Sequence, residues 1–291
     1  MRGLIPILLV VVFASAATIG VWADPSAPAP GVATKSAPRP LTYKGRVFAE
    51  WSVELQTELC PERKIEILKA LIAFGRQGNS PEAISSILSF FDGYRPEFVW
   101  EVLGREPNYQ YGDWNSYLAE EFLDPDDVKA FHTAGLGLRL LANHATPQLV
   151  TFLETPSEHT TARLAVLVTL MRRDDPALGT LSPKLAARSD QFAERFWDLW
   201  GDKYLRSMID TEVYETAAQK MLEFKDQPQL LRAIESMGAN EYGRYIRRHG
   251  NGDAVLKKGD EMLKKLEQST TDPAIREAIE STLEARKITT Q

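Results

Sequence analysis

Proline follows a helix-capping residue at seven places after residue 41, and this recurrence constrains the fold more than any other feature. The pairs are Ser80-Pro81, Asp124-Pro125, Thr146-Pro147, Thr155-Pro156, Asp175-Pro176, Ser182-Pro183 and Asp272-Pro273. The side-chain oxygen of the first residue can accept hydrogen bonds from free backbone N–H groups. Proline at the first helical position loses no hydrogen bond, because a backbone N–H there would have no partner within the helix. Each pair therefore predicts the start of a helix.

Other prolines and several glycines divide the same region into pieces of helical length. Pro61, Pro96 and Pro228 are expected to open helices with weaker caps, and glycines are expected to end helices at Gly75, Gly104, Gly201 and Gly250. The predicted helices include residues 61–74, 81–91, 125–142, 157–173 and 273–286. Many short helices with short connections predict an all-α fold in which antiparallel helices stack, rather than a bundle of few helices.

Three of these segments share one spacing of residue types. Lys64, Arg163 and Arg276 are each followed by an aliphatic residue three positions later, a small residue six later and a leucine seven later. On a helix, the aliphatic residue and the leucine face a core and the small residue lets a neighbouring helix approach. The base is expected to be solvated or to hold a carboxylate in a turn.

The run Asp272-Pro273-Ala274-Ile275-Arg276, followed by Ile279 and Leu283, resembles the second helix of a HEAT repeat, and residues 61–75 look similar. With the Tyr43-Lys44-Gly45-Arg46 opening and Trp51, the chain resembles exported HEAT-like proteins of bacteria. The resemblance implies an α-solenoid, an armadillo-like stack of degenerate HEAT-type helical hairpins that binds partners along one face. It brings no catalytic residues with it.

Residues 1–23 have the anatomy of a secretory signal peptide. Arg2 makes the start basic, residues 4–17 are almost purely apolar, and cleavage is expected after Ala23 or, earlier, after Ala17. If the leader stays uncut, its apolar stretch from 4 to 23 is long enough to anchor the chain in a bilayer. Both alternatives export the domain to the periplasm or cell surface, as a soluble or N-terminally anchored protein.

Residues 24–41 are rich in proline and alanine and predict an extended, disordered linker, because they hold few large apolar residues. Residues 42–291 then form the helical domain. The formal net charge of −6 argues against a nucleic-acid partner. We expect the partner to be an envelope or extracellular protein, with membrane contact only through an uncleaved leader.

No residues with the pattern of a catalytic, metal or cofactor site stand out. The four histidines, His132, His144, His159 and His249, include no pair spaced three or four apart. Cys60, the only cysteine, precedes Pro61 and is predicted to be a small residue at a helix entrance. Asp124, Asp126 and Asp127 are expected to cap a helix, since they lack the distal residues of a calcium loop. We predict no catalytic residue, cofactor or metal.

Two helical features are expected to be structural. Gly135-Leu136-Gly137 lies inside a helical pattern and predicts a point where helices approach closely. Aromatic residues recur at helical spacing near position 200 and are expected to lie in the core: Phe192, Phe196, Trp197, Trp200 and Tyr204.

Residues 108–117 are the first candidate binding surface. Tyr109, Tyr111, Trp114 and Tyr117 alternate with amides and glycine outside a helical pattern, and such residues can stack on sugars or clamp a peptide. The alternative is a long connection that its rings pin to the core.

A basic cluster is the second candidate. Arg244, Arg247 and Arg248 precede His249, with Lys257, Lys258, Lys264 and Lys265 beyond. They could meet an anionic partner or membrane surface, or form a solvated basic face.

The sequence as a whole predicts an exported, non-enzymatic α-helical repeat scaffold that mediates protein–protein interaction in the cell envelope. The main alternative is an envelope enzyme or glycan-binding protein on an all-α fold that uses the aromatic loop 108–117. A structural spacer without a specific ligand is a third interpretation.

Overall fold

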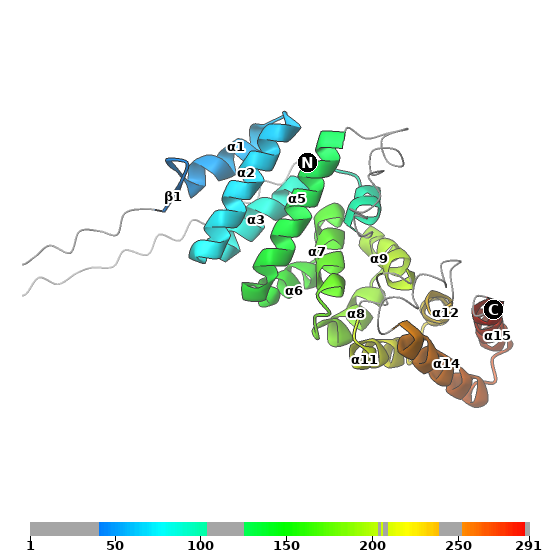
Figure 1. Cartoon of the computed structure of the whole chain (residues 1–291). Coiled ribbons are helices and arrows are strands. Elements are labelled where there is room, and N and C mark those ends of the chain that lie inside the picture. The colour runs from blue at the N-terminus through cyan, green and yellow to red at the C-terminus, as the bar shows by residue number, and fades with distance from the viewer. Residues whose placement is uncertain (1–40, 104–124, 203–204, 206–208, 239–251, 289–291) are drawn as a thin grey trace, which may run out of the picture. The chain divides into compact units, whose positions relative to one another are not determined.

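A computed structural model describes residues 41–103, 125–202, 205, 209–238 and 252–288 (Figure 1). The chain divides into two compact units, residues 1–39 and 40–291, and the described residues belong to the second. They are predominantly helical, which confirms the all-α prediction. The leader and residues 24–40 of the linker lie outside the described residues. None of the helices in the described ranges combines the length and apolarity needed to span a bilayer.

The described chain opens with a short hairpin that the sequence did not predict. Strand β1 (Thr42–Tyr43) pairs antiparallel with β2 (Arg46–Val47), and Lys44 and Gly45 form the turn with φ of 49° and 79°. Helix α1 (Phe48–Thr57) follows directly. Its Trp51 is buried and donates from Nε1 to the carbonyl of Tyr43, 3.2 Å away. The hairpin therefore rests on α1.

The next elements run up to residue 103. They are α2 (Pro61–Phe74), the π-helical turn η1 (Gly75–Asn79), α3 (Ser80–Phe91) and the π-helical turn η2 (Val99–Leu103). Pro61 opens α2 as predicted, with Cys60 at the capping position. Gly75 follows the last residue of α2 as predicted, but its backbone stays right-handed helical and leads into η1; the helical conformation breaks at Gly78, whose φ is 115°.

The remaining described helices follow at short intervals. They are α5 (Pro125–Leu141), the 3-10 turn η3 (Ala142–His144), α6 (Thr146–Glu154), α7 (Thr160–Arg172), α8 (Leu178–Ala186), α9 (Gln191–Gly201), α11 (Thr211–Met221), α12 (Gln227–Ser236), α14 (Gly252–Ser269) and α15 (Pro273–Ile288).

Two of the predicted helix starts are wrong. Thr155 ends α6 instead of opening α7, because its hydroxyl donates to the carbonyl of Thr151 in the last turn of α6. Pro183 lies inside α8, because the chain is already helical when it reaches Ser182. The predicted start at Asp175-Pro176 lies in the turn that precedes α8: the carboxylate of Asp175 accepts from the N–H of Ala177, and the helix itself begins at Leu178.

Other predicted starts lie at the correct place, but not all of them use the predicted side-chain cap. Asp272 caps α15 as predicted, accepting from Ala274 N at 2.9 Å. The hydroxyls of Ser80 and Thr146 instead donate backwards, to the carbonyls of Gly75 and Ala142. Three aspartates that no proline directly follows also cap helices with their side chains: Asp190 for α9, Asp210 for α11 and Asp226 for α12.

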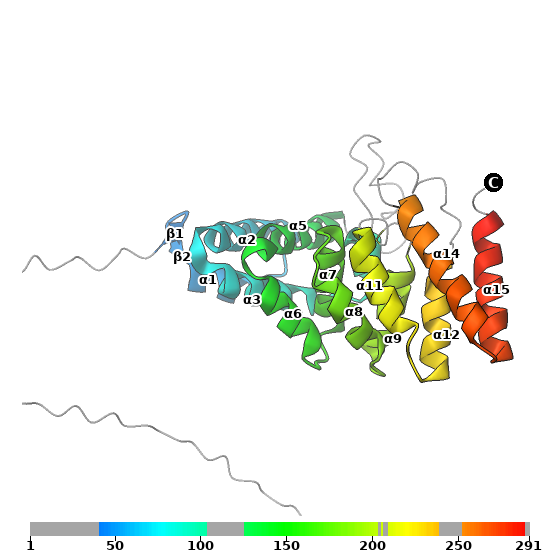
Figure 2. The ribbon, with the colours of Figure 1, turned by 90° about the horizontal axis from the view of Figure 1, so that it is seen from below.

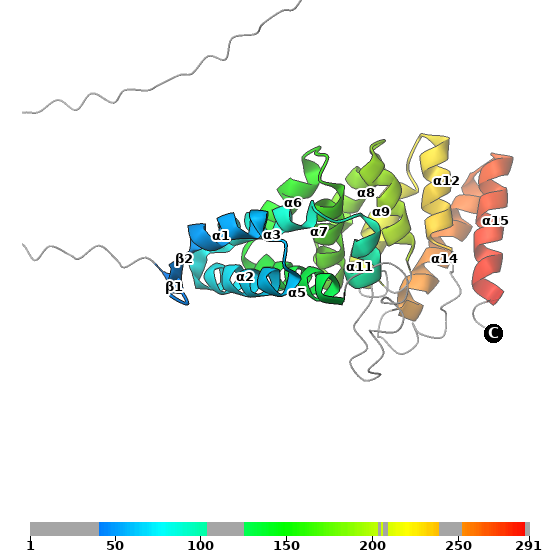
Figure 3. The same ribbon diagram turned by 90° about the horizontal axis from the view of Figure 1, so that it is seen from above.

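Helices in the second unit pack against neighbours that are close in chain order. Adjacent helices pair as α1 with α2, α2 with α3, α6 with α7, α8 with α9, and α14 with α15. Helices further apart by one or two elements also pack, as in α2 with α5, α8 with α11, α9 with α12, and α12 with α15. Figures 2 and 3 both show α2 and α5 along one side of this unit and α1, α3 and α6 along the other.

Glycines bring α2 and α5 close together. A Cβ atom on Gly137 would lie 2.8 Å from Ile72 Cδ1, and one on Gly75 would lie 2.7 Å from Leu141 Cδ1. The contact therefore advances along both helices in the same direction, so α2 and α5 run parallel. A Cβ on Gly135 would likewise meet Leu103. The predicted close-packing point is confirmed.

The core runs through the middle of the helices. In α7 every residue from Thr161 to Met171 is buried, so this helix is covered on all sides. Phe192, Phe196, Trp197 and Trp200 of α9 are buried as predicted, while Tyr204 lies outside the described residues. Trp200 stacks on Tyr214 of α11 with ring centroids 5.9 Å apart.

In the three segments that share one spacing of residue types, the aliphatic position lies in the core. Ile67, Val166 and Ile279 are each fully buried, as expected for the aliphatic position. The bases differ. Arg276 is exposed, whereas Arg163 is fully buried and takes the second predicted role, holding a carboxylate in a turn.

Candidate functional site

The residues proposed from sequence as binding surfaces lie outside the described residues. Tyr109, Tyr111, Trp114 and Tyr117 belong to the stretch 104–124, and Arg244, Arg247 and Arg248 to 239–251. Of the lysines that follow the basic cluster, Lys258 pairs with Glu215 at 3.5 Å and Glu261 at 3.9 Å. The candidate site must therefore come from other residues.

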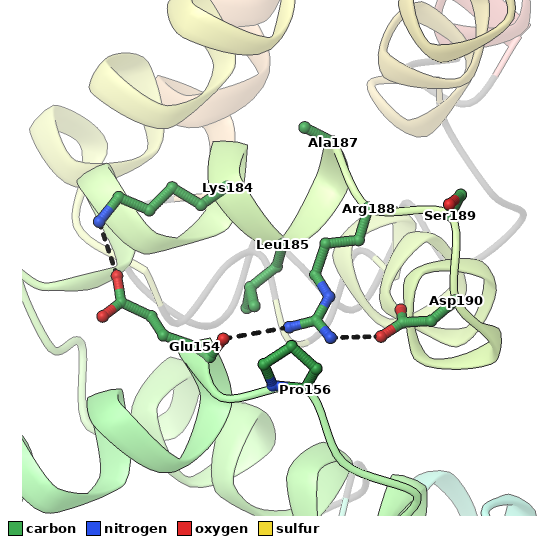
Figure 4. Close-up of a pocket in the computed structure, with 8 residues that line it drawn as sticks. All are labelled: Glu154, Pro156, Lys184, Leu185, Ala187, Arg188, Ser189 and Asp190. Atoms are coloured by element: carbon green, nitrogen blue, oxygen red, sulfur yellow. Dashed lines mark hydrogen bonds and ion pairs between the residues drawn. The ribbon is translucent and has the colours of Figure 1, made fainter.

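An open pocket of about 540 Å³ lies where two inter-helix connections meet (Figure 4). One wall is the end of α6 and the connection to α7; the other is the end of α8 and the connection to α9. Its lining residues are Glu154, Pro156, Lys184, Leu185, Ala187, Arg188, Ser189 and Asp190. Both walls are stretches where backbone polar groups at helix ends need partners.

Arg188 provides those partners for the end of α6. Its Nη1 donates to the carbonyls of Leu153 and Glu154, each at 3.4 Å, and its Nη2 donates to the carboxylate of Asp190. A cation at a helix C-terminus also opposes the negative end of the helix dipole. Arg188 thus joins the two walls of the pocket (Figure 4).

Arg163 anchors the same carboxylate from the protein interior. Its guanidinium lies 3.9 Å from the centre of the Phe192 ring, donates to the carbonyl of Leu153 at 2.8 Å, and reaches Asp190 Oδ2 at 3.3 Å. Burial, and to a lesser degree the charge of Arg188, lower the pKa of Arg163. Arginine stays charged even so, which requires a carboxylate close by.

Asp190 is held by three groups at once. Besides the two arginines, the N–H of Ala193 donates to Asp190 Oδ1 at 3.0 Å, which caps α9. Partial burial opposes ionisation, but the Ala193 N–H and the Arg188 and Arg163 guanidiniums outweigh it and lower the pKa of Asp190. The carboxylate is therefore ionised at neutral pH and fixed in place.

The rim of the pocket is more exposed. Lys184 Nζ lies 2.6 Å from Glu154 Oε1, with side-chain exposures of 65% and 40%. An ion pair this exposed contributes little to stability, about 0–1 kcal/mol. Both side chains can therefore exchange partners at small cost, in contrast to Arg188 and Asp190.

These contacts define what the pocket can do chemically. Its ionised groups are positioned by partners on other elements, and Pro156, Leu185 and Ala187 add apolar surface between them. Such a mixture suits the side chains of a bound polypeptide segment, which need both apolar contact and charged partners.

Other chemistry-bearing residues lie apart from this pocket. Cys60 is exposed, and its Sγ donates to Glu62 Oε2 at 2.9 Å. Asp126 pairs with Lys129, and Asp127 accepts from Tyr94 Oη at 2.9 Å, both in the first turn of α5. Within the described ranges, no three His, Cys, Asp or Glu side chains are grouped as metal ligands.

Sequence reasoning missed this site, although one signal was available. Asp190 precedes the aromatic helix by one residue, which is the position of a capping residue. No proline follows Asp190, so it lacks the pair of residues that marks the other predicted helix starts.

Comparison of the chain with protein families, with curated proteins and with solved structures gives no match.

Proposed function

We propose that residues 42–291 form an exported α-solenoid of degenerate HEAT-like helix pairs that binds a partner protein and does not catalyse a reaction. The observation that carries this proposal is the order of packing, in which helices contact neighbours close in the chain. Contacts limited to nearby elements are characteristic of repeat proteins, which bind partners along the surface that the stacked helices create.

The parallel contact of α2 and α5 supports the same arrangement. In a stack of helical hairpins, the second helices of successive pairs lie side by side in the same direction. Gly75 opposite Leu141 and Gly137 opposite Ile72 give α2 and α5 this relationship.

The pocket supports a binding role. Arg188 and Asp190 are held by hydrogen bonds before any partner arrives, so little conformational entropy is lost when a ligand contacts them. The two walls of the pocket are connections between helices. Binding residues are common on connections that a rigid scaffold holds in position.

Site-specific photocrosslinking tests the binding role. A photoreactive phenylalanine analogue replaces Ser189, an exposed pocket residue, in the full chain inside the producing cells. The matched control carries it at Gln268, which is exposed near the end of α14. We expect one discrete crosslinked protein from position 189 and none from 268.

Two results would overturn the binding role of the pocket. One is the absence of any crosslinked protein at position 189 when the variant is produced at the normal level. The other is turnover of an envelope glycan by the purified protein, which would favour the enzyme alternative. Export is tested separately, by recovering the protein outside the cytoplasm with residues 1–23 present and inside the cytoplasm when they are deleted.

A further inference from the structure

Most of α5, the C-terminal half of α2 with η1, and the whole of α7 carry basic but no acidic residues. The segments 67–79, 128–144 and 160–173 contain Lys69, Arg76, Lys129, Arg139, Arg163, Arg172 and Arg173, and no Asp or Glu. Helix α5 packs against both α2 and α7, so these segments are neighbours (Figure 1). Arg163 is buried toward the pocket, and the other bases are at least partly accessible.

Exposed leucines lie within this basic region. Leu136 and Leu140 of α5 are 37% and 44% exposed and are one helical turn apart. Arg139 is exposed between them. The other large exposed apolar side chains in the described part of the chain, Leu41, Val53 and Leu59, belong to residues 41–59.

Arg173 is fixed against the end of α5. Its Nη2 donates to Asn143 Oδ1 at 2.6 Å, and its Nη1 donates to the carbonyl of Arg139 at 3.2 Å. The acidic residue that follows it, Asp174, accepts from the N–H of Asp210 and is thus committed elsewhere. Arg173 therefore stays against the end of α5 with its charge not neutralised by its neighbour in sequence.

Further cations adjoin the same leucines. Burial, with the charges of Arg172 and Arg139, lowers the pKa of His132, so these two arginines act on one imidazole one turn before Leu136. On the other side, Gly75 packs against Leu141, so Arg76 follows directly in sequence a residue that contacts the end of α5.

Helix electrostatics explain only part of this pattern. Bases near helix C-termini are favourable because they oppose the helix dipole. That accounts for Arg76, Arg139 and Arg173, but not for two leucines left partly exposed among them. Apolar side chains on a surface with cations are complementary to a polypeptide that presents an apolar residue between carboxylates.

We infer that this surface, the α5 basic face (Lys69, Arg76, Leu136, Arg139, Leu140 and Arg173), binds an acidic segment of a partner protein that carries leucine-like side chains. This inference rests on the proposed function and names the chemistry of the partner. A protein segment fits better than an anionic membrane for two reasons. More than half of each leucine is already covered, which leaves little to insert into lipid, and a fixed guanidinium suits paired contacts with carboxylates.

Fluorescence anisotropy with the full chain tests the inference. The probe is a labelled peptide with a Glu-Glu-Leu-Leu-Glu-Glu core, and a Lys-for-Glu version is the charge control. We expect the acidic peptide to bind and the basic one not to bind. The triple variant Leu136→Gln, Arg139→Gln, Leu140→Gln should weaken binding at least about tenfold, since buried apolar contacts and charge pairs are both lost.

The matched control removes exposed apolar residues elsewhere. Val53→Gln with Leu59→Gln should leave peptide affinity unchanged, and thermal melts of all variants show that each is folded. Equal affinity of the triple variant and the parent protein would overturn the inference, as would the absence of peptide binding. Cosedimentation with vesicles of anionic lipid that is lost in the triple variant, without peptide binding, would replace it with a membrane surface.

These outcomes are distinguishable from failure of the proposed function. A crosslinked protein at position 189 together with no peptide binding would reject the α5 basic face alone. Peptide binding without a crosslink would reject the pocket as a contact point and retain this surface.

Discussion

Arg163, in the first turn of α7, holds the carboxylate of Asp190, the residue that caps α9, at 3.3 Å. The guanidinium is fully buried, while the carboxylate is 37% exposed at the pocket. One acidic side chain therefore serves the interior, the start of a helix and the wall of the candidate site together. Its removal should affect all three.

We predict that Asp190→Ala lowers the free energy of unfolding by on the order of 3 kcal/mol, because it leaves Arg163 buried beside only Arg188 and removes a helix cap. Chemical denaturation of the full chain measures this. Asp226→Ala is the matched control: it removes a cap without a buried partner and should cost about 1 kcal/mol. Equal losses in the two variants would show that the Arg163 contact contributes nothing.

The double variant Arg163→Met with Asp190→Ala should be more stable than Asp190→Ala alone. The buried charge is then gone together with its partner, and methionine restores apolar contact with Phe192. Additive losses of stability would contradict this account of the pair.

Gly137→Ala should destabilise the protein by about 1–3 kcal/mol, because the new methyl group would overlap the buried Ile72 and Ile87 side chains. Gly201→Ala, at the end of α9, is the control, since its added Cβ would meet Ser236 only at ordinary contact distance. That change should be neutral or stabilising. Thermal melts that show no difference between the two variants would disprove the close contact of α2 and α5.

Stability should fall in acid through Glu54. The hydrogen bond from Arg63, aided by Arg46 and opposed by partial burial, lowers the pKa of Glu54. Its contribution is complete above the ordinary value of 4.5 and is lost as pH falls through the lowered pKa in the fold. Glu54→Gln should therefore lower the melting temperature at neutral pH, and the difference from the parent should shrink as pH falls below about 4.5. A difference independent of pH would contradict this.

The mature chain is expected to begin at Asp24 if the leader is cleaved after Ala23. Intact-mass measurement of protein recovered from outside the cytoplasm checks this directly. A mass that begins at Thr18 would indicate the earlier cut, and a full-length mass would indicate a retained anchor.

Much of the fold could be predicted from sequence because its rules are local. Pro61 and Asp272 mark helix starts through their own chemistry, and Ile67 and Leu71 face the core because of helical spacing. The errors occurred where a side chain had a second use. Thr155 looks like a capping residue, but its hydroxyl bonds backwards into the helix that it ends.

The candidate site could not be predicted in the same way. It depends on Arg163 and Asp190, which are separated by most of two helices and meet only after the connections fold. The parallel contact of α2 and α5 likewise becomes visible only when Gly137 lies against Ile72. The spacing of Arg163 showed that it had a role but not which carboxylate it would hold.

The complete burial of α7 has a consequence for synthesis of the chain. Its packing partners include α3 and α5 before it and α9 after it. A growing chain that has emerged only as far as α7 still lacks α9, so the surface of α7 that α9 covers is open to contact with other nascent chains. Protection of this segment must wait until residue 201 has left the ribosome, and a truncation before α9 should yield insoluble protein.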